Sequence, residues 1–341
     1  MTKDVRDGRD VRDGRGVGDE RDVRDVRDVR DVRDVGGVRD GRGERFTVAV
    51  LGPGGVGGLL AALVARAGHR VICLAGDATA EVLRADGIRV RSGRFGEFTA
   101  RVEADTELRE PVDACLITVK HTALDTALDR VPARALGDGL LVPFLNGVEH
   151  PAALRARYGP ARVAPAVIRV ESTRTAPGVI DHASPFAEID LTGDTVARER
   201  LDALAGVLAA AGPDVRVQAD EAAVLWAKMA FLAPFALLTT RYGVPLGEVR
   251  TLHRTELTAL VAETAAVSRA SGAPADPATA LARYDAFPPG AKSSMQRDAE
   301  AGRPLELDAI GGALLRAAAR HGAPVPVAER LVREVEDAVP R

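Results

Sequence analysis

Apolar residues in the first half of the chain, after a polar N-terminal stretch, fall in short runs that alternate with helical periods. The run 46–51 reads as a buried strand, and the apolar spacing over 59–67 predicts the helix that follows it. Gly68 ends that helix, and the run 70–74 predicts a second strand. The pattern therefore begins with a β-α-β unit.

Further strands follow, and then the pattern becomes wholly helical. Four more apolar runs have strand length, at 113–119, 140–144, 162–171 and 185–191. The near-continuous apolar character of the first two is typical of parallel strands that are covered on both faces. Only helical periods remain after Gln218, over 220–242, 252–271, 277–286, 305–321 and 327–339. We therefore expect an α/β domain over 46–213 and an all-helical domain over 219–341.

The N-terminal stretch, residues 1–45, has a different composition. Asp-Val-Arg and Asp-Gly-Arg triplets repeat through it, with almost nothing to bury. Such a mixture of charges does not offset the entropy of ordering, so we expect a disordered low-complexity tail. Either the tail mediates an interaction or it lies upstream of the true translation start. We favour the second interpretation because Phe46 is the first residue able to enter a fold.

A glycine-rich turn joins the first predicted strand to the first predicted helix, with the sequence Gly52-Pro53-Gly54-Gly55-Val56-Gly57. Gly52 permits a tight turn, Gly54 lets the backbone approach a phosphate, and Gly57 lets the helix pack close to the strand. The first amides of the helix then point at the anion. We predict a dinucleotide pyrophosphate site here, the alternative being a glycine-rich turn without a nucleotide.

Composition narrows the class of protein. With 341 residues, 46% of them hydrophobic, the chain can bury two cores. A net charge of -3 gives no electrostatic reason to propose nucleic acid or an anionic membrane as partner. Cys73 and Cys115 fall in predicted strands, which favours buried, reduced thiols. No Cys/His cluster has metal-ligand spacing, so we expect no metal.

The same pattern bears on location. The longest apolar runs are interrupted too often to span a bilayer, and the N-terminus has no apolar signal region. We therefore expect a soluble, cytoplasmic protein.

Lysine is rare in this chain, since only four of its 46 basic residues are Lys rather than Arg, at positions 3, 120, 228 and 292. A retained lysine suggests proton transfer, because Arg stays protonated while a desolvated Lys is tuned towards neutrality. Lys228 is the strongest candidate, since its helical neighbours are Val224, Leu225, Phe231 and Leu232. The alternative is a lysine whose stem packs on apolar surface while its head reaches water.

Other polar residues stand at ends of predicted elements. Lys120 and Asn146-Gly147 follow two predicted parallel strands, at the edge where α/β sheets bind ligands. A solvated strand end and an ordinary turn are the alternatives. Ser293-Ser294 reads as a helix start whose hydroxyls cap amides, and Glu306 heads another helix, where it favours the dipole.

Taken together, these residues resemble the ketopantoate reductase (2-dehydropantoate 2-reductase) family. The resemblance runs from Phe46 to about Glu336 and rests on an ordered set of motifs: Gly52-x-Gly54-x-x-Gly57, Val119-Lys120, Asn146-Gly147, Trp226-Ala227-Lys228, Ser293-Ser294-Met295 and 301–308. It implies a Rossmann-type dinucleotide-binding domain followed by an all-helical domain like that of 6-phosphogluconate dehydrogenase. It also implies reduction of 2-dehydropantoate to pantoate with NADPH, on the route to pantothenate and coenzyme A.

The resemblance further implies roles for individual residues. Lys228 would donate the proton to the carbonyl oxygen as hydride arrives at carbon. The substrate would be bound by Lys228, Asn146 and Ser294. The cofactor would be held by eight residues: Gly52, Gly54, Gly55, Val56, Gly57, Lys120, Asn146 and Glu306.

The chain departs from the family pattern at three places. Gly76-Asp77 stands after the second strand, where the family commonly has an Arg that grips the 2′-phosphate, so NADH is an alternative cofactor. Leu145 replaces the usual Gln before Asn146. Three positions that often have Asn in the family, and contact the polar groups of the substrate, are Leu232, Ala236 and Leu246. Either other residues recognise pantoate or the substrate is a less polar 2-oxo acid.

Two further readings remain open. One is a reductase of another small branched 2-oxo acid, and the other is a non-catalytic NAD(P)-binding sensor. The presence of Lys228, Ser294 and Glu306 favours an enzyme, because a sensor needs only the glycine turn. A homodimer through the helical domain is a further expectation.

Overall fold

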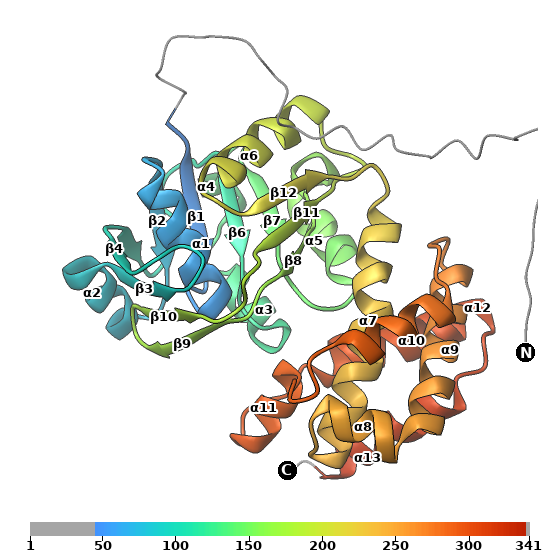
Figure 1. Cartoon of the computed structure of the whole chain (residues 1–341). Helices are drawn as coiled ribbons and strands as arrows, with labels where there is room; N and C mark the ends of the chain where they lie inside the picture. Colours follow the sequence, from blue (N-terminus) through green and yellow to red (C-terminus); the bar gives the residue numbers. More distant parts are fainter. Residues whose placement is uncertain (1–44, 339–341) are drawn as a thin grey trace, which may run out of the picture. The chain divides into compact units, whose positions relative to one another are not determined.

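The computed structural model describes residues 45–338 of the chain, and our predictions for residues 1–44 lie outside that part. Its first element is the predicted strand, β1 (Thr47–Leu51), followed by the predicted helix, α1 (Gly55–Arg66), and by β2 (Arg70–Leu74). The β-α-β unit expected from the apolar pattern is therefore present (Figure 1). The helix begins four residues earlier than expected, inside the glycine turn itself.

A five-stranded parallel sheet forms the centre of the α/β region, in the order β5-β2-β1-β6-β7. Its other strands are β5 (Glu103–Asp105), β6 (Ala114–Ile117) and β7 (Leu140–Pro143). Val50 of β1 lies opposite Cys73 on one side and Leu116 on the other. Every residue of β6 and β7 is buried, as the apolar runs predicted. All carboxyl ends therefore meet at one edge of this sheet.

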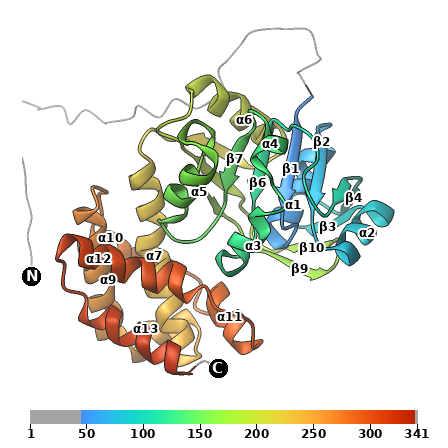
Figure 2. The same cartoon turned by 180° about the vertical axis from the view of Figure 1, so that it is seen from behind.

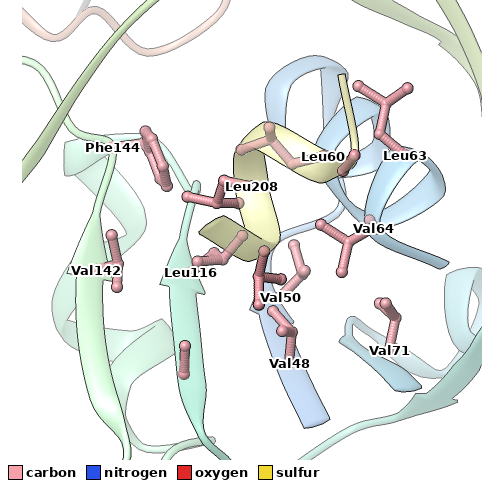
Figure 3. Close-up of a cluster of buried hydrophobic side chains, with 14 of the residues drawn as sticks. Val48, Val50, Leu60, Leu63, Val64, Val71, Leu116, Val142, Phe144 and Leu208 are labelled. Atoms are coloured by element: carbon pink, nitrogen blue, oxygen red, sulfur yellow. The ribbon is translucent and has the colours of Figure 1, made fainter. Parts of the chain in front are cut away.

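Helices cover both faces of the sheet. On one face Val48, Val50 and Leu116 pack against α1 and α6 (Arg198–Ala210), and Figure 3 shows Leu60, Val64 and Leu208 among them. The other face packs against shorter helices: α3 (Leu124–Leu128), α4 (Ala133–Leu136) and α5 (His150–Tyr158). α2 (Asp77–Asp86) follows β2. Both cysteines are buried and free, and burial raises the pKa of each thiol to about 12.

Two smaller sheets complete the α/β region. One has the order β4-β3-β10-β9 and the other β12-β11-β8. Their strands are β3 (Ile88–Ser92), β4 (Phe98–Ala100), β8 (Ala166–Arg169), β9 (Ser172–Ala176), β10 (Val179–His182), β11 (Glu188–Leu191) and β12 (Asp214–Val217). β8 and β11 lie inside predicted runs, whereas β3, β4, β9, β10 and β12, like β5 of the central sheet, were not predicted. β12 pairs with β11, so strand structure continues past residue 213.

The remainder is helical (Figures 1 and 2). Its elements are α7 (Glu221–Tyr242), α8 (Leu246–Leu252), α9 (Arg254–Ala270), α10 (Pro277–Ala286), α11 (Ser294–Glu300), a π-helical turn η3 (Asp308–Gly312), α12 (Ala313–His321) and α13 (Pro326–Ala338). Asp220 caps α7 by accepting the Ala223 amide at 2.9 Å. A parallel-sheet domain followed by helices confirms the predicted fold class. The helices α8 and α11 are additional to the five helical segments that the apolar pattern predicted.

One expectation needs correction. We expected every apolar run to be too interrupted to span a bilayer, but α7 is long and apolar enough, with a mean hydropathy of 1.7 over its best window. Its buried side chains, among them Trp226, Met229 and Leu237, pack in the apolar core of the helical region. The core helix of a soluble protein has the same composition, so α7 by itself does not indicate a membrane.

Candidate functional site

The glycine turn has the geometry that its sequence predicts. Gly52 has a φ of +83°, which favours glycine, and a Cβ there would lie 2.5 Å from the Val119 side chain. At Gly57 a Cβ would lie 2.1 Å from Oγ1 of Thr118 and 2.6 Å from the Gly52 carbonyl oxygen. These two glycines therefore let α1 start tight against the ends of β1 and β6.

The N-terminus of α1 is suited to an anion. Its N-cap is Gly54, which makes no side-chain cap, and its first turn, which includes Gly55 and Val56, has no acidic residue. A Cβ at Gly54 would meet no atom closer than 3.9 Å, so the space beside this backbone is open. Uncapped amides and the helix dipole attract a phosphate. The turn therefore fits a dinucleotide pyrophosphate.

Lys120 follows β6 and forms an ion pair with Asp298 of α11. Asp298 is buried, and it also accepts a hydrogen bond from Nε of Arg303 at 2.8 Å. Sequence reasoning missed Asp298. The sequence did contain a signal for Asp298, because it lies three residues after Met295. On a helix that spacing places the Asp298 carboxylate on the same face as Met295, which is buried.

Glu306 joins both strand ends that the sequence singled out. Its carboxylate accepts the backbone amide of His121 at 2.8 Å and Nδ2 of Asn146 at 2.9 Å. Glu306 is only 7% exposed, and it comes just before η3 in the helical region. Three predicted site residues, Lys120, Asn146 and Glu306, are therefore brought to one place, with Lys120 next in sequence to His121.

Lys228 lies in the second turn of α7 and is half-buried. Its ammonium has no hydrogen bond or ion pair within the described part of the chain. Burial lowers its pKa to about 8, the Glu306 carboxylate opposes that shift, and the Arg169 guanidinium adds to it. An ammonium with a pKa near neutrality is suited to giving up a proton at physiological pH.

The two serines at the start of α11 differ in environment. Ser293 is buried, accepts the Gln296 amide at 3.0 Å as the N-cap, and accepts Oγ1 of Thr239 at 2.8 Å. Ser294 is exposed, and its hydroxyl makes no hydrogen bond to other described residues. The cap is therefore Ser293 alone, which leaves the Ser294 hydroxyl available for a ligand.

The structure shows the surroundings of the residues that depart from the family pattern. Leu232 is half-buried, whereas Ala236, Leu246 and Leu145 are buried in apolar clusters. None of these side chains offers a hydrogen bond to a substrate.

Gly76 and Asp77 lie exposed at the N-terminus of α2. Arg130, which sequence reasoning missed, reaches the same strand end. Its Nη1 donates to the Ala75 carbonyl at 2.6 Å and to the Thr106 carbonyl at 3.2 Å. A cation therefore lies near the position where the family has its Arg, although it comes from a different element.

Comparison with known proteins identifies the family to which this architecture belongs. The family model described as ketopantoate reductase PanE/ApbA matches residues 48–191, and the model of its C-terminal domain matches residues 221–338. The chain belongs to the ketopantoate reductase family. Members of this family are oxidoreductases that act on a small keto acid.

Individual members of the ketopantoate reductase family resemble the whole described part of the chain. A 2-dehydropantoate 2-reductase of Caulobacter vibrioides is 30% identical over 287 residues, which is 82% of this chain and 94% of that protein. The crystal structure of 2-dehydropantoate 2-reductase from Geobacter metallireducens has a TM-score of 0.79 at 28% identity, covering 86% of this chain and 99% of its own.

The same fold also occurs in a protein that is named D-mandelate dehydrogenase. A ternary structure of D-mandelate dehydrogenase with NADH and anilino(oxo)acetate has a TM-score of 0.77 at 18% identity, and it covers 85% of this chain and 97% of its own. At that identity the likeness concerns the fold alone.

Proposed function

We propose that this chain reduces a small 2-oxo acid with NAD(P)H and that Lys228 is the proton donor. The observation that supports this most directly is a half-buried ammonium, without a partner in the described chain, whose pKa is lowered to about 8 beside Glu306. Burial prepares the lysine to release a proton, and the nearby carboxylate keeps it from losing that proton too early.

Different residues of the chain would bind the cofactor, bind the substrate and supply the proton. The nicotinamide supplies the hydride when the cofactor is bound. The turn Gly52–Gly57 holds the pyrophosphate through backbone amides, and Lys120, Asn146 and Glu306 line the cofactor side of the site. Lys228 stabilises the negative charge that develops on the 2-oxo oxygen and transfers its proton there, leaving a neutral amine. Ser294 and Asn146 bind the substrate.

The first candidate substrate is 2-dehydropantoate, which would be reduced to pantoate for pantothenate and coenzyme A synthesis. This is supported by the family and by relatives named 2-dehydropantoate 2-reductase at about 30% identity. A second candidate is another small branched 2-oxo acid. It is favoured by the apolar residues Leu232, Ala236 and Leu246, because a site for a hydroxylated substrate normally supplies hydrogen-bond partners.

The proposal also covers the cofactor, the domain boundary, the cellular location and the oligomeric state. We propose NADPH as cofactor, with NADH as the alternative because Asp77 would repel a 2′-phosphate and accept a ribose hydroxyl. We propose a domain boundary near residues 213–219, and the pairing of β12 with β11 supports a position after β12. The two buried free thiols favour a cytoplasmic location. A homodimer through the helical domain remains a prediction.

The test is a turnover assay with both cofactors. Purified protein should oxidise NADPH or NADH when given 2-dehydropantoate, and Lys228→Ala should remove most turnover while cofactor binding, followed by fluorescence, stays intact. Turnover with other 2-oxo acids alone would move the assignment to the second candidate. Unchanged turnover in Lys228→Ala would overturn the role of the lysine.

A further inference from the structure

A buried histidine near the proposed site has no partner. His150 is the first residue of α5, and its side chain is only 2% exposed. Neither Nδ1 nor Nε2 has a hydrogen bond to any residue of the described chain. A buried polar group without a partner costs free energy, so its presence calls for a physical explanation.

The segment around His150 is otherwise well paired with the helical region. Asn146 donates to Glu306 at 2.9 Å, Glu149 accepts Nη2 of Arg316 at 2.7 Å, and Arg155 donates to Glu221 at 2.7 Å. Each of these contacts reaches a residue at or beyond the start of α7. Figures 1 and 2 both show α5 beside the first half of α7. His150 is therefore a polar residue without a partner in the middle of a paired segment.

Three basic side chains act on the pKa of His150. Burial, followed by the charges of Lys228 on α7, His121 after β6 and Arg155 on α5, lowers the pKa of His150 to about 3. The Glu306 carboxylate binds the His121 amide and acts on Lys228 as well. The imidazole is therefore neutral at physiological pH, with one nitrogen free to accept a hydrogen bond. The Lys228 ammonium, which has three donors, lacks a partner too.

We propose that His150 is a positioning residue for Lys228, whose ammonium donates to the neutral imidazole through one buried water. This inference rests on the proposed role of Lys228. A neutral acceptor fixes the direction of the ammonium and leaves its positive charge uncompensated. A carboxylate would fix the direction as well but would also neutralise the charge. The positive charge thus remains available to the 2-oxo oxygen of the substrate.

Two variants test the proposal, with 2-dehydropantoate or the 2-oxo acid that the turnover assay identifies. His150→Leu should lower kcat on the order of 10-fold or more, with little change in the Kd of the cofactor. His150→Leu should also move the alkaline limb of the pH profile of kcat to lower pH, because the variant lacks the hydrogen bond that stabilises the ammonium form of Lys228. His150→Gln, which keeps an acceptor, should restore much of both. Equal losses in both variants with an unmoved alkaline limb would show a merely structural role and overturn the proposal.

A second measurement does not depend on turnover. In protein labelled with 15N-histidine, the His150 ring should be neutral at pH 5, and its nitrogen shifts should change in Lys228→Met. Unchanged shifts would overturn the inference. The two proposals fail separately: an active Lys228→Ala removes the proton-donor role, whereas an inactive Lys228→Ala with an unaffected His150→Leu removes only the role of His150.

Discussion

Three glycines of the turn after β1 lack a side chain for different reasons. Gly52 has a positive φ, and Gly57 has no room for a Cβ beside Thr118. Folding alone explains these two. Gly54 has open space beside it, with the nearest atom 3.9 Å from a hypothetical Cβ. Packing within the described chain does not account for its missing side chain, whereas a pyrophosphate that approaches from outside would.

Gly54→Ala should therefore separate binding from folding. We expect the Kd for NADPH or NADH to rise on the order of 10-fold or more, because the methyl group fills the space where the phosphate approaches. The melting temperature should stay the same. Gly206→Ala in α6 is the matched control, since a Cβ there also meets nothing within 4 Å, and it should leave the Kd unchanged. Fluorescence titration measures both, and unaltered affinity in Gly54→Ala would contradict the assignment.

At the scale of elements, α11 links several parts of the site. Ser293 caps it and accepts a hydrogen bond from Thr239 of α7, so the start of α11 is tied to the helix that bears Lys228. One turn later, the buried Asp298 pairs with Lys120. The exposed Ser294 lies between these two anchors. A short helix is thus held at both ends while its first hydroxyl stays available.

Alanine at each serine in turn should distinguish the cap from the ligand group. Ser293→Ala should lower the free energy of unfolding by about 1 kcal/mol, the usual cost of losing an N-cap, as measured by urea denaturation. Ser294→Ala should leave stability unchanged and raise the KM for the 2-oxo acid. If Ser294→Ala alters neither quantity, the hydroxyl does not bind substrate.

At the scale of the whole described chain, a few long-range contacts assemble the site. Asn146 and Glu306 are 160 residues apart in sequence, and Lys120 and Asp298 are 178 apart. Each pair joins the carboxyl edge of the parallel sheet to the helical region. The charge of Glu306 also reaches Lys228, so this carboxylate affects both the strand-end loops and the proposed proton donor.

Glu306→Gln should shift the pH dependence of turnover. The carboxylate favours the ammonium form and so raises the pKa of Lys228 against the lowering effect of burial. Without that charge the pKa should fall below about 8, and the alkaline limb of kcat should move to lower pH. Glu300→Gln, which removes an exposed partner of Lys292, is the control and should leave the limb in place. A limb unchanged in Glu306→Gln would show that the charge does not act on the proton donor.

Local pattern was enough for much of this fold. The strands β1, β2, β6 and β7 and the helix α7 follow from apolar periodicity, because both faces of the parallel strands and half of α7 are buried. The strands β3, β4, β5, β9, β10 and β12 were missed. Most residues of β9 are exposed, and β10 pairs in parallel with the distant β3, so neither strand has a clear apolar signature.

The sequence by itself determined the elements around the glycine turn, the helix that bears Lys228, and the residues with the right chemistry at strand ends. Tertiary structure alone decided which of them meet. The pairing of Asp298 with Lys120, the double role of Glu306 and the burial of His150 all depend on contacts between residues far apart in the chain. Periodicity reports only which face of an element is buried, whereas partners across the fold are set by how the elements pack.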